Sequence, residues 1–175
     1  GAGAGASTGR RAVEGTGVLA ERAAATPQSL AAGQPVSLSS MATMADGIVV
    51  GCPGEIPYAI VRELVDSIET VSEDTLSRAV LFLLERAKLL VEPAGAAAVA
   101  LLLDAGPQVY EGPVVAVLSG GNIDPVLLLR IIRHGLVIAG RYLQFRVRVP
   151  DTPGSLAGLL ADLAAADANV VDIEH

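Results

Sequence analysis

The chain has 175 residues, 51% of them hydrophobic and 18% charged, which predicts a globular protein with one full core and part of a second domain. Its formal net charge of −7 and its aromatic content of 3% exclude nucleic acid as a partner, because that binding needs a basic face and stacking side chains. No apolar run reaches the roughly 18 residues of a membrane span and no signal-peptide pattern is present, so we expect no membrane partner and a cytoplasmic location.

The first part of the chain combines a glycine-rich start with a short strand and a helix. GAGAGASTG at 1–9 indicates a loop, and the apolar GVLAE at 17–21 indicates a strand. Thr26 followed by Pro27 is typical of a helix start, and Gly33 is typical of a helix end. We therefore expect a strand and a helix after the loop.

Turn residues precede the next helix and strand. The stretches MADG (44–47) and GCPGEIP (51–57) are rich in turn formers. They include the single cysteine, Cys52, which has no partner for a disulfide and no neighbours at metal-site spacing. Apolar spacing predicts a helix over 56–65, and SIETV predicts a strand over 67–71.

The clearest helix of the chain begins after Ser72. Ser72 is a favourable N-cap, and Glu73 and Asp74 place negative charge in the first turn, where the helix dipole stabilises it. We expect this helix to end near Leu90. It contains Lys88, the one lysine among the 12 basic residues of the chain.

A second helix, a strand and a third helix follow. Pro93 is typical of a first helical position, and the alanine-rich stretch after it should stop at Gly106. The continuous apolar run PVVAVL at 113–118 predicts a strand buried on both faces of a parallel sheet. Asp124 begins a helix that we expect to end at Gly135. This order of elements predicts an α/β layer architecture.

The pattern changes after Gly140, where a second domain is predicted to begin. YLQFRVRV at 142–149 alternates apolar and polar residues, as a half-buried strand does. DTPGS at 151–155 then turns into a helix, and NVVDIEH at 169–175 starts a second strand. We expect 1–140 and 141–175 to be separate domains, the second of them incomplete.

Ser119 follows the predicted strand, at the position where open α/β sheets bind ligands. Gly120 and Gly121 after it permit a tight turn and close approach of a ligand to the backbone. A plain strand-to-helix turn, in which Ser119 bonds only to the backbone, is the alternative.

Several motifs in this order resemble the second half of threonine dehydratases (threonine ammonia-lyases): TMADGI, ELVDSIETVSEDTLSRA, ERAKLLVEPAGAAAVA, VLSGGNIDP and RVPDTPGSLAGLLADLAAADANVVDIEH. Those enzymes belong to the fold-type II pyridoxal phosphate family, together with serine racemase and serine dehydratase. The resemblance implies a parallel sheet flanked by helices. It identifies the residues after Gly140 as the start of an ACT domain, a ferredoxin-like module that senses amino acids.

The resemblance implies a site for pyridoxal 5'-phosphate around Ser119. The Ser119 hydroxyl would hydrogen-bond the pyridine nitrogen, with Gly120 beside it. Glu92 in EPAGA would lie near the cofactor face, although a helix-start acid that pairs with Lys88 is an alternative. Gly47 in ADG would approach the cofactor edge through its backbone.

The glycine-rich start resembles, less closely, the family's loop that holds the phosphate at a helix N-terminus. Aligned on its last glycine, the loop places Gly3 and Gly5 on two of the family's glycines and alanines on the other two. A linker, or a loose dinucleotide-binding pattern that lacks its preceding strand, is an alternative.

A regulatory site is also implied by the resemblance. Asp151, Pro153 and Gly154 would line a site for an effector such as isoleucine or valine, and the sheets of ACT domains pair between subunits, so a homo-oligomer is implied. A helix N-cap turn with proline explains the same residues equally well.

The family's Schiff-base lysine would lie upstream of the glycine loop, so we expect no catalytic residue of that kind in this chain. Lys88 lies within the matched ERAKLL helix, where a surface lysine is the ordinary interpretation. Glu21 is the one acid close to the position of the metal site of some relatives, so we expect no metal site. The chain is therefore expected to be a fragment that is inactive alone.

By resemblance, the whole enzyme would be a lyase that uses pyridoxal 5'-phosphate to convert L-threonine, and L-serine as a second substrate, to an oxo acid and ammonia. With threonine the product is 2-oxobutanoate, and the reaction is the committed step toward isoleucine. A regulatory amino-acid-binding module is one alternative, and a relative of serine racemase or serine dehydratase is another.

Overall fold

Two parallel strands form the sheet of the protein. The computed structural model describes residues 13–106 and 109–174, and in it β1 (Thr16–Ala20) pairs with β2 (Ser67–Val71). The register sets Thr16 opposite Ser67 and Ala20 opposite Val71. Parallel pairing requires a crossover between the strands, and the helices between Ala20 and Ser67 supply it. Both strands predicted in this part of the sequence are confirmed.

The crossover contains two α-helices and two short 3-10 helices. The α-helices are α1 (Ala25–Ala32) and α2 (Glu55–Leu64), and the 3-10 helices are η1 (Glu21–Ala23) and η2 (Asp46–Ile48). Gly33 ends α1 with φ of 70° and donates its backbone N–H to Leu30 and Ser29 carbonyls, as predicted. The predicted start at Thr26 is wrong, because α1 begins at Ala25 without a side-chain cap.

Helix α3 (Glu73–Phe82) begins as its sequence predicts. The Ser72 hydroxyl accepts a hydrogen bond from the backbone N–H of Thr75 at 3.1 Å. The helix continues as η3 (Leu83–Ala87), a π-helical turn, and ends at Ala87, directly before Lys88, which has φ of 58°. The end is therefore three residues earlier than Leu90, because Lys88 adopts a left-handed conformation that a right-handed helix cannot continue.

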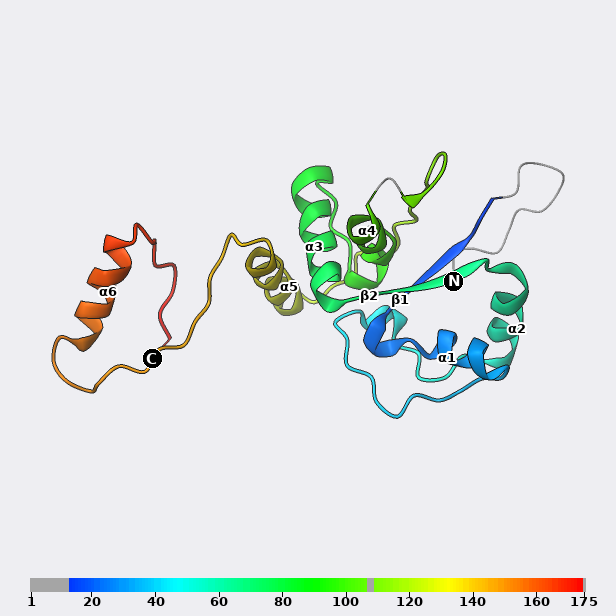
Figure 1. The fold of residues 1–175 in the computed structure, drawn as a ribbon, viewed down its shortest axis with the longest axis horizontal. Coiled ribbons are helices and arrows are strands. Elements are labelled where there is room, and N and C mark those ends of the chain that lie inside the picture. Colours follow the sequence, from blue (N-terminus) through cyan, green and yellow to red (C-terminus); the bar gives the residue numbers. More distant parts are fainter. Residues whose placement is uncertain (1–12, 107–108, 175) are drawn as a thin grey trace. The chain divides into compact units, whose positions relative to one another are not determined.

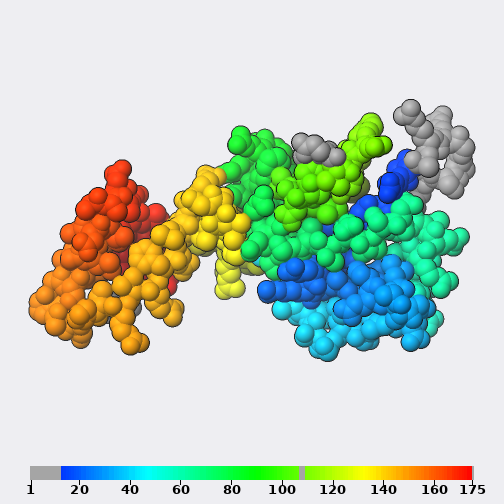
Figure 2. Space-filling view, viewed as in Figure 1, coloured from blue at the N-terminus to red at the C-terminus, as the bar shows by residue number. Residues whose placement is uncertain are grey.

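Helices α4 (Pro93–Ala105) and α5 (Pro125–Ile138) complete the core of the first compact unit, Gly1–Tyr142. Helix α3 packs against both, and α4 packs on β1 and β2. Figure 1 shows α4 and α1 on opposite sides of the two strands, and Figure 2 shows side chains of α3 and α4 in contact at the surface. Helix α5 runs past the predicted end at Gly135, because that glycine is buried where α5 crosses α3 and does not terminate the helix.

The core of this unit consists mainly of small and branched apolar side chains. Leu76 and Ile131 are the largest of its fully buried side chains, at 0% and 1% exposure. Leu76 comes from α3 and Ile131 from α5. Helix α4 contributes alanines, which permit its close approach to the strands and to α3. The helices around the sheet thus form the α/β architecture that the sequence predicts.

The predicted strand at 113–118 does not form. No strand is assigned there, and Val115 is 85% exposed. A β-strand needs a neighbouring backbone to complete its ladder of hydrogen bonds, and in the part of the chain that the structure describes no segment pairs with these residues. The segment still leads from α4 to α5 and brings Ser119 to the start of α4.

The second compact unit, Leu143–His175, contains one helix, α6 (Ser155–Ala165), as predicted. The strands predicted at 142–149 and 169–175 are not formed by its described residues. Their backbones make no ladder with one another, and apolar side chains such as Leu143 are exposed, at 77%. None of the helices in the described residues is both long and apolar enough to cross a membrane.

Candidate functional site

A cavity of about 480 Å³ opens where α4 and α5 begin. The loop before η2 forms a further wall. Because both helices start here, the positive ends of two helix dipoles point toward the cavity. The lining residues come from these three segments, and they are Met44, Asp46, Gly47, Glu92, Pro93, Ala94, Asn122, Ile123, Asp124, Pro125 and Leu127.

The two helix starts present their acids differently. Asp124 caps α5, since its Oδ1 accepts hydrogen bonds from the backbone N–H groups of Val126 and Leu127 at 2.8 and 3.0 Å. Glu92 occupies the same position before α4 but makes no side-chain cap. Its carboxylate is instead available at the cavity wall.

Glycines make room for the Glu92 carboxylate. A Cβ atom on Gly120 would lie 2.0 Å from Glu92 Oε1, and one on Gly47 would lie 3.5 Å from the same oxygen. The Glu92 backbone N–H donates to the Gly120 carbonyl at 3.1 Å. Three residues to which the sequence assigned cofactor contacts are thus neighbours, although they are far apart along the chain.

The alternative partner of Glu92, Lys88, is not beside it. The Lys88 ammonium donates to the backbone carbonyl of Glu85 at 2.8 Å. Among the described residues Lys88 forms no ion pair. The pairing of Glu92 with Lys88 is therefore wrong, because the left-handed backbone at Lys88 interrupts the helical spacing on which it depends.

Ser119 lies directly against the start of α4. A Cβ atom on Gly95 would lie 1.5 Å from the Ser119 carbonyl oxygen, so this close approach requires glycine. The Ser119 side chain is exposed, and its hydroxyl has no hydrogen-bond partner among the described residues. Ser119 does not line the cavity itself, but Asn122 and Ile123 shortly after it do.

The other residues predicted for sites lie in separate places. Gly3 and Gly5 are outside the described residues. In the second unit, Asp151 and Pro153 belong to the turn before α6, and Gly154 precedes the helix with φ of 92°. The hydroxyls of Thr152 and Ser155 lie 2.8 Å apart across this turn.

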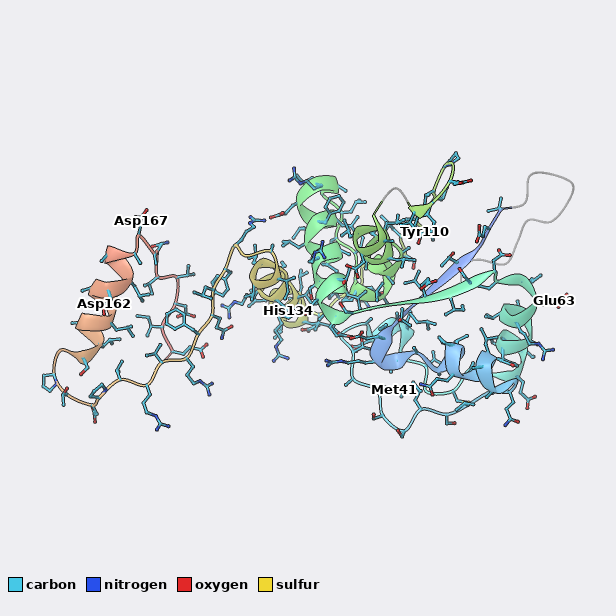
Figure 3. The ribbon with its side chains drawn as sticks, viewed as in Figure 1. Met41, Glu63, Tyr110, His134, Asp162 and Asp167 are labelled. Atoms are coloured by element: carbon cyan, nitrogen blue, oxygen red, sulfur yellow. The ribbon has the colours of Figure 1, made fainter. Side chains whose placement is uncertain are left out.

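Sequence reasoning missed two contacts of α3: one with a residue that lines the cavity, and one with α5. Met44, which precedes the ADG motif, lines the cavity and is bonded to α3, 29 residues away along the chain. His134 on α5 (Figure 3) places its Nε2 2.7 Å from Asp74 Oδ1 of α3. No local signal in the sequence indicates either contact, because both depend on how the helices pack.

The described residues fit the cofactor that the sequence implies. The start of α4 brings together the exposed Ser119 hydroxyl and the Glu92 carboxylate. Gly47 and Gly120 leave room for this carboxylate, and an open cavity lies beside it. The phosphate loop of the implied site lies outside the described residues. Among the residues that are described, no cluster of three or more His, Cys, Asp or Glu side chains could hold a metal ion.

Comparison with known proteins gives consistent results. Residues 1–120 match the family model described as "Pyridoxal-phosphate dependent enzyme". The chain is 43% identical to an L-threonine ammonia-lyase of Geobacter sulfurreducens over 91% of its own length and 40% of the relative. The chain thus spans about two fifths of the length of this relative.

Solved structures are similar over about two thirds of the chain. Threonine deaminase isoform 2 from Solanum lycopersicum, in its processed form, aligns with a TM-score of 0.63 at 30% identity, covering 69% of this chain and 36% of that one. A maize serine racemase aligns with a TM-score of 0.58 at 30% identity, covering 66% and 37%.

Proposed function

The chain belongs to the family of pyridoxal-phosphate dependent enzymes, and on this premise we propose that the complete protein removes ammonia from L-threonine to give 2-oxobutanoate. One observation carries the proposal: Ser119, Gly120, Gly47 and Glu92 meet at the start of α4, beside an open cavity. The L-threonine ammonia-lyase to which the chain is similar over 91% of its length supports the choice of substrate. With threonine as substrate, the reaction would supply the committed step toward isoleucine.

In this proposal, the exposed hydroxyl of Ser119 hydrogen-bonds the pyridine nitrogen of pyridoxal 5'-phosphate. The backbones of Gly47 and Gly120 border the ring, and Glu92 presents its carboxylate at the same wall. Gly3 and Gly5 contribute backbone N–H groups to the phosphate. When bound, the cofactor supplies an electron sink for the α-carbon of the substrate.

A serine at this position suits elimination. A carboxylate would keep the ring nitrogen protonated and make the sink stronger, whereas a neutral hydroxyl does not. Loss of a β-hydroxyl group needs less delocalisation of charge than transamination does. The residue at 119 therefore favours ammonia-lyase chemistry and suppresses side reactions.

The test is product formation by the complete protein supplied with pyridoxal 5'-phosphate. We expect 2-oxobutanoate from L-threonine, a smaller rate with L-serine, and no product from D-threonine. This chain alone is expected to give no product, because Lys88 is bonded to a backbone carbonyl of its own helix and does not line the cavity. Conversion of L-serine to D-serine without oxo-acid formation would favour the serine racemase alternative and refute this one.

We propose further that 1–140 is part of the catalytic domain and 141–175 the start of an ACT domain that binds an amino-acid effector. The separation of a compact unit after Tyr142 supports this division. So does the alignment with the Geobacter relative, which covers 91% of the chain and must extend beyond the first unit. Asp151, Pro153 and Gly154 at the start of α6 would line the effector site.

Calorimetric titration of the complete protein with isoleucine and with valine tests the effector proposal. Saturable binding that Asp151→Asn weakens is expected, and no heat with either amino acid would refute it. We also propose a cytoplasmic homo-oligomer, in which second units pair. Sedimentation of the complete protein as a monomer at micromolar concentration would contradict the oligomer.

A further inference from the structure

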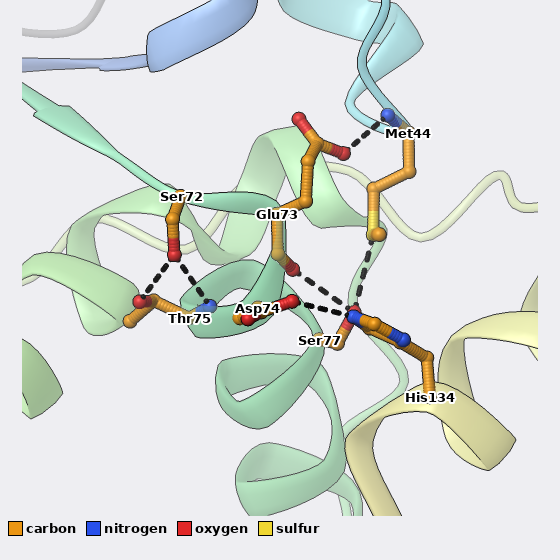
Figure 4. Close-up of polar contacts among 7 residues, drawn as sticks. All are labelled: Met44, Ser72, Glu73, Asp74, Thr75, Ser77 and His134. Carbon is orange, nitrogen blue, oxygen red and sulfur yellow. Dashed lines mark hydrogen bonds and ion pairs between the residues drawn. The ribbon is translucent and has the colours of Figure 1, made fainter. Parts of the chain in front are cut away.

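The first turn of α3 is bonded to the loop that borders the cavity. Glu73, the first residue of α3, accepts a hydrogen bond at Oε2 from the backbone N–H of Met44 at 2.8 Å (Figure 4). One turn later, the Ser77 hydroxyl lies 3.3 Å from the Met44 sulfur and 3.0 Å from the Glu73 carbonyl. Met44 is therefore held at its backbone and at its side chain by one helix.

At the start of α3, Glu73 carries an energetic cost that Asp74 does not. Its Oε1 is buried and has no hydrogen-bond partner among the described residues, and an unpaired buried carboxylate oxygen is unfavourable. Asp74 supplies the same negative charge to the helix start from an exposed position. The contact with Met44 is what distinguishes Glu73 from Asp74.

The remaining hydrogen bonds of the loop are local. The Ala45 N–H donates to the Thr43 hydroxyl at 3.1 Å, and the Ile48 N–H donates to the Ala45 carbonyl at 3.0 Å. Neither bond fixes the loop to another element. The hydrogen bonds that Met44 makes with Glu73 and Ser77 do so, and Met44 is itself a residue that lines the cavity.

Displacement of this loop would change the cavity wall. Met44, Asp46 and Gly47 all line the cavity, and a Cβ atom on Gly47 would lie only 3.1 Å from Ala94 Cβ at the start of α4. The fit is close enough that a small movement of the loop alters the space beside Glu92.

From these contacts we propose that Glu73 is a positioning residue, which holds the Met44–Gly47 loop against the cavity and thereby sets the affinity for the cofactor. The proposal rests on the proposed function, since it assumes that pyridoxal 5'-phosphate binds in this cavity. Glu73 acts through Met44 and does not itself line the cavity.

The test compares three variants of the complete protein. Glu73→Ala removes the acceptor, and Glu73→Gln keeps a carbonyl oxygen that can accept from the Met44 N–H. Asp74→Asn is the matched control, because it removes one carboxylate from the same helix turn without touching the loop. Its contact with His134 is exposed, and such surface pairs contribute little.

Two quantities are measured for each variant. One is the rate of hydrogen exchange of the Met44 amide in the cofactor-free form, and the other is the dissociation constant for pyridoxal 5'-phosphate, measured by fluorescence. For Glu73→Ala we expect both to rise by roughly 10- to 100-fold, as loss of a hydrogen bond to a charged group predicts. Glu73→Gln should restore most of both, and Asp74→Asn should change neither by more than about twofold.

The outcomes separate this proposal from the proposed function. Unchanged Met44 exchange in Glu73→Ala, or equal loss of cofactor affinity in Asp74→Asn, would overturn the positioning role even if threonine is turned over. Faster Met44 exchange with weaker cofactor binding would support it even if the unaltered protein forms no 2-oxobutanoate. If Glu73→Ala fails to fold, Glu73→Gln decides the question. A Glu73→Gln variant that folds but still shows fast exchange of the Met44 amide would also overturn the positioning role.

Discussion

Gly120→Ala tests whether the space at the start of α4 is reserved for the Glu92 carboxylate. Gly120 has φ of 80°, and a Cβ atom there would lie 2.0 Å from Glu92 Oε1. The left-handed backbone alone costs an L-residue about 1–2 kcal/mol. Because the clash is with the end of a flexible side chain, we expect Glu92 to move out of its place without further loss of stability.

Gly112→Ala is the matched control for this substitution. Gly112 has φ of 85° and no atom within 4 Å of its Cβ position. The free energy of unfolding of Gly112→Ala, measured with urea, should therefore fall by the same amount, about 1–2 kcal/mol. In the complete protein, Gly120→Ala should also weaken binding of pyridoxal 5'-phosphate by about tenfold, the effect of losing one well-placed polar contact. Equal cofactor affinity in the two variants would show that the place of the Glu92 carboxylate beside Gly120 does not affect cofactor binding.

Three further substitutions test the fold around the site by urea unfolding. Gly95→Ala should destabilise the protein by about 1–3 kcal/mol or more, because its Cβ atom would lie 1.5 Å from the Ser119 carbonyl oxygen. Unchanged stability would mean that the segment before α5 does not lie against the start of α4. Leu76→Ala removes a fully buried side chain and should cost about 2–5 kcal/mol, and a loss below about 1 kcal/mol would contradict its place in the core. Ser72→Ala removes the cap bonded to the Thr75 N–H and should cost about 0.5–2 kcal/mol, whereas no loss would show that the cap contributes nothing.

The elements that sequence reasoning predicted well are those whose signals are local. Ser72 caps α3 through a residue three positions away, and Pro93 occupies the first turn of α4 with no N–H to satisfy. Gly33 ends α1 with its own positive φ. In each case neighbouring residues determine the geometry, so the pattern is sufficient.

The segment 113–118, which was predicted to be a strand, shows that local patterns cannot establish strand pairing. Its apolar residues are those of a buried strand, but a strand is defined by a partner backbone, and none pairs with it among the described residues. The same holds for 142–149. Periodicity gives the propensity of a segment, whereas pairing depends on the rest of the fold.

The residues proposed for the cofactor site could be named from the sequence, but their relative positions could not. The resemblance named Ser119, Gly120, Glu92 and Gly47, and the structure brings the last three together. The bond between Glu73 and Met44 joins residues 29 positions apart, and it follows from the packing of α3 against the loop. From the sequence, only the negative charge of Glu73 in the first turn of a helix could be predicted.

The proposed function depends on a neutral hydroxyl at position 119 that faces the pyridine nitrogen of the cofactor. The most direct test is the nitrogen NMR shift of ¹⁵N-labelled pyridoxal 5'-phosphate bound to the complete protein, compared between the unaltered protein and Ser119→Asp. We predict an unprotonated ring nitrogen with Ser119 and a protonated one with aspartate. The same shift in both proteins would contradict this role of Ser119, because it would show that the side chain does not contact the ring.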